Sequence, residues 1–142
     1  MLLLSLEYLH SKGVVHRDLK PSNIFMESYP TGLTILKVGD FGLSKMDLEQ
    51  LKRKMTETFG LQTTAAYMAP EVLNDNDPTQ KVDIWAAGVI FYEMISALKH
   101  PFEAKTIPAM SLAITQNQFH ALPPTVSPFI QQLINQLFNK NP

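Results

Sequence analysis

The sequence predicts a mainly α-helical protein in which short β-ribbons interrupt the helices. Residues 79 to 98 are apolar on almost every side of a helix, which is typical of a central helix that a domain packs around. Helical spacing of apolar residues recurs near both ends of the chain, whereas runs with strand character cover only three or four residues. With 142 residues, of which 45% are hydrophobic and 18% charged, the chain is long enough for one globular domain.

Charge and cysteine content exclude several classes of partner. The net charge is −1, so we expect no nucleic-acid partner. No run approaches the roughly 20 apolar residues of a membrane span, and we expect no membrane partner. The apolar start at Met1 has no preceding basic residue and is interrupted by Glu7, so we do not expect a signal peptide. Without cysteines there is no disulfide or thiolate metal site, which allows a reducing compartment but does not show one. Because we expect neither a signal peptide nor a membrane span, we expect a cytoplasmic protein, with the nucleus as the alternative.

The first half of the chain predicts one helix and two short strands. Leu2, Leu6 and Leu9 lie at helical spacing, and Gly13 is placed to end that helix. Residues 24–26 and 35–38 have strand character, and the segment between them is too long for a two-residue hairpin turn. Residues 43–66 show no lasting periodicity, so they should form a long connection that is either functional or mobile.

The second half predicts helices. A short helix should follow Ala69 and reach Asn74. Thr79 is expected to cap the central helix, about 79–98, and a weaker helix should cover residues 107–115. Ser127, followed by Pro128, begins a final helix of about 127–139 with one apolar stripe.

One octet carries most of the chemistry. His16-Arg17-Asp18-Leu19-Lys20-Pro21-Ser22-Asn23 places an acid, a cation and an amide within a few positions of one another. Phosphoryl transfer needs an acid to accept a hydroxyl proton, a cation beside the phosphate and oxygen ligands for a metal ion. The octet also matches the pattern H-R-D-L-x-x-x-N.

Two further motifs follow the octet in a fixed order, Asp40-Phe41-Gly42 and then Ala69-Pro70-Glu71. With the apolar helix after them, they make nearly the whole chain resemble the C-terminal lobe of a eukaryotic protein kinase. The resemblance implies a partial kinase domain over residues 1–142, with a catalytic loop at 16–23 and an activation segment at 40–71. It implies ATP and Mg²⁺ as cofactors and a protein substrate with serine or threonine.

The resemblance also implies a role for each matching residue. Asp18 matches the catalytic base, Lys20 the lysine that neutralises the transferring phosphoryl group, and Thr64 the threonine that faces the substrate. Asn23 and Asp40 match the two magnesium ligands, and Phe25 the floor beneath the adenine ring. His16, Phe41, Glu71 and Asp83 match structural residues of the family. A lysine at the place of Lys20 makes the chain resemble the serine/threonine class of protein kinases.

Regulation is implied as well, with one departure from the family pattern. Arg17 and Lys45 match basic residues that hold a phosphorylated activation loop. The usual phosphorylation position, four residues before Thr64, is Gly60 here. Three nearby threonines remain candidates for the phosphorylation site: Thr56, Thr58 and Thr63.

Other family features are absent from the sequence. It contains no Gly-rich phosphate loop and no strand lysine, so we expect the missing N-lobe of the same parent chain as a partner and little activity without it. The last helix of the lobe is also absent, and with it the arginine that pairs with Glu71. An unpaired buried carboxylate there would cost about 3–5 kcal/mol. The segments 23–25 and 100–123 resemble NIMA-related kinases, while 37–42 is also similar to kinases of translation initiation factor 2. A non-catalytic lobe that only binds partners is the alternative.

Overall fold

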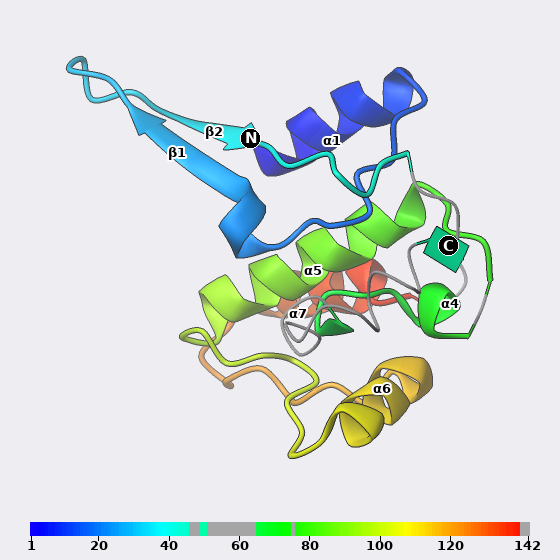
Figure 1. Cartoon of the computed structure of the whole chain (residues 1–142). Helices are drawn as coiled ribbons and strands as arrows, with labels where there is room; N and C mark the ends of the chain where they lie inside the picture. The colour runs from blue at the N-terminus through cyan, green and yellow to red at the C-terminus, as the bar shows by residue number, and fades with distance from the viewer. Residues whose placement is uncertain (46–48, 51–64, 75, 140–142) are drawn as a thin grey trace.

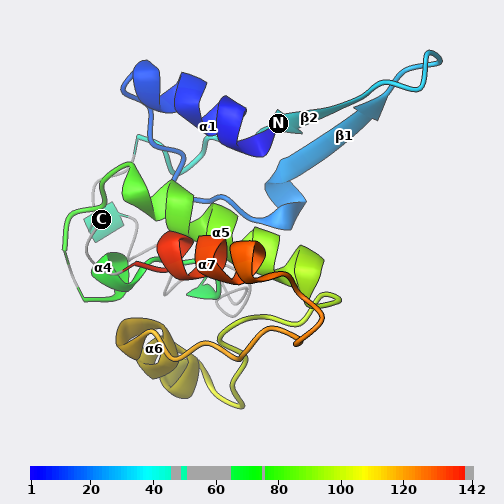
Figure 2. The same cartoon turned by 180° about the vertical axis from the view of Figure 1, so that it is seen from behind.

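The computed structural model describes residues 1–45, 49–50, 65–74 and 76–139 (Figure 1). In these ranges the chain folds as a stack of helices with one antiparallel ribbon at its edge. Helix α5 lies in the middle, with α1 and the ribbon on one side of it and α6 on the other (Figures 1 and 2). The described residues therefore contain a single β-ribbon, where the sequence suggested more than one.

Helix α1 spans Leu2–Ser11 and buries Leu6 completely. Gly13 ends it in the left-handed region, with a φ of 70°, as the sequence predicted. The amide of Gly13 donates to the carbonyl oxygen of His10 at 3.0 Å, which satisfies one of the free carbonyls at the helix end. The chain then turns back toward α5 and enters the octet.

The ribbon consists of β1, Ile24–Ser28, and β2, Thr34–Val38, preceded by a single 3-10 turn at Pro21–Asn23. Its register pairs Ile24 with Val38 and Ser28 with Thr34. The strands extend beyond their apolar cores, so the connection between them is only five residues long, 29–33, with Gly32 at a φ of 82°. Both views show the ribbon projecting away from the helices (Figures 1 and 2).

Helix α5 spans Lys81–Ile95, which is shorter than the predicted 79–98. Its N-cap is Gln80 rather than Thr79, although the Thr79 hydroxyl still accepts from the Lys81 amide at 3.2 Å. The helix ends early because Ala97 and Leu98 adopt φ values of 56° and 67°. The Leu98 amide then donates back to the carbonyl oxygen of Glu93 at 2.8 Å, which closes the end of the helix.

Both faces of α5 are buried, each in a different apolar cluster. One cluster joins α1 and the octet to α5 through Leu6, Leu19, Ala86, Ala87 and Ile90. The other includes the aromatic side chains Trp85, Tyr92, Phe102 and Phe138. The sequence prediction of a buried central helix is therefore confirmed for most of its length.

Helices α4, α6 and α7 complete the stack. They span Pro70–Leu73, Ile107–Gln116 and Pro128–Leu137. Ser127 caps α7 by accepting from the Ile130 amide at 3.4 Å, as the sequence predicted. Gly88 allows α7 to approach α5 closely, because a Cβ at this position would lie 3.0 Å from the Cβ of Leu137. In the described part of the chain, no helix combines the length and apolar character that crossing a membrane requires.

Candidate active site

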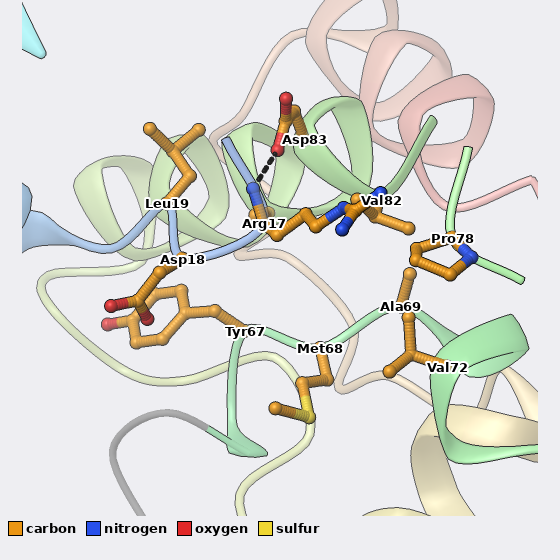
Figure 3. A pocket seen from close by; sticks show the side chains of 11 residues that line it. Arg17, Asp18, Leu19, Tyr67, Met68, Ala69, Val72, Pro78, Val82 and Asp83 are labelled. Carbon is orange, nitrogen blue, oxygen red and sulfur yellow. Dashed lines mark hydrogen bonds between the residues drawn. The ribbon is translucent and has the colours of Figure 1, made fainter. Parts of the chain in front are cut away.

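The octet is held in an irregular backbone conformation by a carboxylate on α5. Arg17 has a φ of 66°, in a region that costs a non-glycine residue free energy. The two carboxylate oxygens of Asp83 offset this free-energy cost by accepting hydrogen bonds from the loop. One accepts from the His16 amide at 2.9 Å. The other accepts from the Arg17 amide, also at 2.9 Å (Figure 3). The shape of this loop therefore depends on a side chain 66 residues further along the chain.

The Asp83 carboxylate also binds a third group, which sequence reasoning missed. His10, near the end of α1, has its Nε2 atom 2.8 Å from Oδ2 of Asp83. Asp83 is only 1% exposed, and three groups surround it as a buried carboxylate requires. No local signal in the sequence points to His10, because its partner lies 73 residues away.

His16 connects the octet to the end of β2. Its Nε2 atom is 2.9 Å from the carbonyl oxygen of Gly39, and its Nδ1 atom accepts from the Asp18 amide at 3.3 Å. A carbonyl only accepts and an amide N–H only donates, so the ring is neutral with its hydrogen on Nε2. The ring also packs on Phe41, with 4.9 Å between ring centroids. His16 thereby fixes the distance between Asp18 and the Asp40-Phe41-Gly42 segment.

The Asp18 carboxylate is oriented by its neighbours in the octet. Lys20 Nζ lies 3.0 Å from Oδ2 of Asp18, and Asn23 Nδ2 donates to the same oxygen at 3.2 Å. Asn23 also donates to the main-chain carbonyl of Asp18 at 2.8 Å. Both side-chain contacts use Oδ2, which leaves Oδ1 as the oxygen to which no described residue donates. Asp18 is therefore a preoriented hydrogen-bond acceptor.

The oxygens of Asn23 and Asp40 form a donor set that suits Mg²⁺. The Asn23 amide nitrogen is used by Asp18, so its amide oxygen remains as a potential ligand on a buried side chain. Asp40 is exposed, has a φ of 60° and accepts from the Gly42 amide at 3.3 Å. Carboxylate and amide oxygens are the hard ligands that Mg²⁺ prefers. The residues present therefore fit this metal ion chemically.

Residues 67–69 lie against the octet and form one wall of a small cavity of about 20 Å³. Its lining includes Arg17 and Asp18 on one side and Tyr67 and Met68 on the other (Figure 3). The Tyr67 hydroxyl donates to the carboxylate of Glu93 on α5, at 2.8 Å from Oε2. Burial raises the pKa of Tyr67, and the hydrogen bond to Glu93 raises it further. Burial also raises the pKa of Glu93, while the bond from Tyr67 opposes that effect.

Two residues named from the sequence, Phe25 and Glu71, lie partly in solvent, and the role of Phe25 beneath adenine stays a prediction. The Phe25 ring lies over Gly39, where a Cβ would come within 2.9 Å of it, but the side chain is 55% exposed. Glu71 is not buried as expected: it is partly exposed and lines a cavity of about 240 Å³ together with Trp85. The free-energy penalty for an unpaired buried carboxylate therefore does not apply to Glu71 in this structure.

Several regulatory candidates remain predictions. Lys45 is exposed on the turn after Asp40-Phe41-Gly42. Thr56, Thr58, Thr63 and Thr64 lie outside the described residues.

Comparison with known proteins gives consistent results over the whole chain. A family model for the protein kinase domain matches residues 1–142. Serine/threonine-protein kinase Nek8 of Danio rerio is 37% identical over 141 residues, which cover 99% of this chain and 19% of Nek8. Serine/threonine-protein kinase Nek5 of Homo sapiens is 34% identical over 139 residues, covering 98% of this chain and 18% of Nek5.

A relative from another group of kinases is similar to the same extent. Ribosomal protein S6 kinase alpha-3 of Homo sapiens is 36% identical over 141 residues, covering 99% of this chain and 18% of that protein. The chain therefore spans about a fifth of the length of these relatives.

Proposed function

Because the chain belongs to the protein kinase domain family, with serine/threonine kinases among its relatives, we propose that it carries the hydroxyl-side and metal-side half of a kinase active site. The reaction is transfer of the γ-phosphoryl group of ATP to serine or threonine hydroxyls of a protein. The observation that supports this best is the Asp18 carboxylate, which Lys20 and Asn23 orient while Asp83 shapes the loop around it.

Each residue of the octet has a distinct task in this proposal. Asp18 Oδ1 accepts a hydrogen bond from the substrate hydroxyl and receives its proton as the oxygen–phosphorus bond forms and the bond from the γ-phosphorus to the β–γ bridging oxygen breaks, which releases ADP. Lys20, held beside Asp18, provides positive charge where negative charge builds up on the transferring group. Asn23 and Asp40 would hold Mg²⁺, which would supply positive charge against the phosphates of ATP.

A second part of the site must grip the nucleotide. The sequence has no Gly-rich loop, and Phe25, proposed as the floor under adenine, is largely exposed. An open hollow of about 540 Å³ lies between α1 and β2, lined by Leu4, Tyr8, Leu36 and Phe41 among others. We propose that an N-lobe of the same parent chain covers this apolar hollow and supplies the phosphate grip.

Activation by phosphorylation is part of the proposal. A phosphate on Thr56, Thr58 or Thr63 would pair with Arg17 and Lys45 and order the activation segment. Thr64 would lie on the side of the site where the substrate hydroxyl binds.

The test is a phosphoryl-transfer assay with labelled ATP, Mg²⁺ and a generic protein substrate. It uses two proteins, the full 142-residue chain and the same chain joined to a kinase N-lobe. We expect turnover from the joined protein and little from the chain alone. Asp18→Asn should lower kcat by about 10²–10⁴-fold, the usual contribution of a general base.

The control is Asp77→Asn, which changes an exposed acid in the loop before α5 in the same way. It should leave turnover unchanged. If the joined protein binds protein substrates but transfers no phosphate, the alternative of a non-catalytic binding lobe replaces the proposal.

A further inference from the structure

His100 lies in the loop that follows α5 and touches two main-chain groups with its two ring nitrogens. Nε2 is 3.0 Å from the carbonyl oxygen of Ala66, and Nδ1 accepts from the Phe102 amide at 3.1 Å. A carbonyl cannot donate and this amide cannot accept, so the ring is neutral with its hydrogen on Nε2. Both nitrogens are therefore used in one defined orientation.

The two partners of His100 lie in different parts of the fold. Phe102 is 1% exposed and stacks on Trp85 at 5.5 Å between ring centroids, so its amide is anchored in the core. Ala66 directly precedes Tyr67 and Met68, which line the cavity shared with Arg17 and Asp18 (Figure 3). His100 thus connects a fixed point in the core to the segment beside the octet.

Tyr67 strengthens this connection from the other side. Its ring meets the His100 ring edge-on, with 5.9 Å between centroids and an interplanar angle of 88°. Its hydroxyl is held by Glu93. Ala66 is therefore held by the loop that follows α5, and Tyr67 is held by Glu93 on α5.

The charges around His100 are consistent with a neutral ring. Burial lowers the pKa of His100, and the nearby His120 lowers it further, whereas the bond to Ala66 and the Glu103 carboxylate act in the opposite direction.

We propose that His100 is a positioning residue: through Nε2–H it holds the Ala66 carbonyl and so sets the path of residues 65–69 beside Asp18. The functional part of this proposal, that residues 65–69 receive the protein substrate, rests on the proposed kinase function. His100 itself does not touch the reacting atoms.

Two substitutions test the contacts of the two His100 ring nitrogens separately. Glutamine places its amide near the position of Nε2, so His100→Gln can still donate to Ala66. Asparagine places its amide near Nδ1, so His100→Asn can accept from Phe102 but cannot reach Ala66. A role in packing alone would make the two variants behave alike.

The experiment measures amide hydrogen exchange on the full 142-residue chain by mass spectrometry. We expect His100→Asn to speed exchange in peptides covering residues 65–69 by about five- to tenfold, the effect of one lost hydrogen bond. His100→Gln should stay within about twofold of the original chain. Exchange in the ribbon, 24–38, serves as the internal reference and should not change in either variant.

Equal exchange in both variants at residues 65–69 would overturn the proposal, whether both are fast or both unchanged. If His100→Asn speeds exchange in the ribbon equally, its effect is global unfolding, and the positioning role is also rejected.

Kinetics with the joined protein give a second measurement. His100→Asn should raise the KM for the protein substrate while kcat and the KM for ATP stay within about twofold, and His100→Gln should restore the KM. An equal fall in kcat in both variants would contradict a role in substrate positioning. Absence of turnover in the original joined protein would reject the proposed kinase function, and hydrogen exchange would then decide the positioning of residues 65–69 by itself.

Discussion

Asp83 shows how much of the candidate site depends on one side chain. Its carboxylate accepts from two successive amides of the octet and also contacts His10. An amide at this position would keep one accepting oxygen and turn a donor toward groups that themselves donate. Because a hydrogen bond to a charged group contributes about 1.5–3 kcal/mol, Asp83→Asn should lower the free energy of unfolding by at least about 2 kcal/mol.

Urea denaturation of the full chain measures this loss. Asp77→Asn, which makes the same chemical change on an exposed side chain, should change the free energy of unfolding by less than about 0.5 kcal/mol. Equal losses in the two variants would show that the contacts of Asp83 contribute no particular stability.

The residues that could be predicted from sequence are those that belong to short linear motifs. Asp18 and Asn23 are predicted site residues because they lie within one octet, and Asp40 because it begins the Asp40-Phe41-Gly42 motif. His10 and His100 could not be predicted in this way. Their partners, Asp83 and Ala66, lie 73 and 34 residues away, and each contact exists only after the helices have packed.

At the scale of an element, Gly88 marks a close contact between α5 and α7. A Cβ there would lie 3.0 Å from Leu137 Cβ and 3.1 Å from Phe138 Cε1, so α5 and α7 would have to separate slightly. Overpacking costs about 1–3 kcal/mol, whereas alanine gains up to about 1 kcal/mol over glycine in helix propensity. Gly88→Ala should therefore lower the melting temperature of the chain.

Ala97→Gly provides the matched opposite change just beyond the same helix. Ala97 is exposed and has a φ of 56°, a conformation that glycine adopts without steric cost. This variant should keep or raise the melting temperature. A rise for Gly88→Ala would mean that α7 adjusts without loss.

The predicted elements agree with the structure in kind and differ at their ends. Apolar periodicity predicted the helices, because burying an apolar face is what holds them in place. The end of α5 could not be predicted, since Ala97 and Leu98 adopt positive φ values without the glycine that usually marks such an end. The strands are longer than their apolar cores because the backbone pairing continues through Ser28 and Thr34.

At the scale of the whole molecule, the partly buried Tyr67 beside the octet makes the free energy of unfolding depend on pH in the alkaline range. The folded chain raises the pKa of Tyr67 above its ordinary value of 10.0, chiefly through burial, so the unfolded chain loses the phenol proton first. The stabilisation is complete below about pH 10 and decreases above it, by up to about 1.4 kcal/mol per pH unit. Thermal melts of the original chain and of Tyr67→Phe between pH 8 and about pH 11 measure the difference.

Tyr67→Phe should be less stable at pH 8, because it loses the bond to Glu93, but its stability should fall less steeply above about pH 10. Parallel curves for the two proteins over the whole range would count against the role assigned to the Tyr67 hydroxyl.

Helix α5 separates two apolar clusters and belongs to both. Neither cluster can lose its packing without exposing one face of this helix to water. The octet and Asp83 lie on one side, while α6 and α7 pack on the other. Partial unfolding of either side alone is therefore costly, and the two sides should behave as one cooperative unit, so that the candidate site persists only as long as the distant helices remain packed.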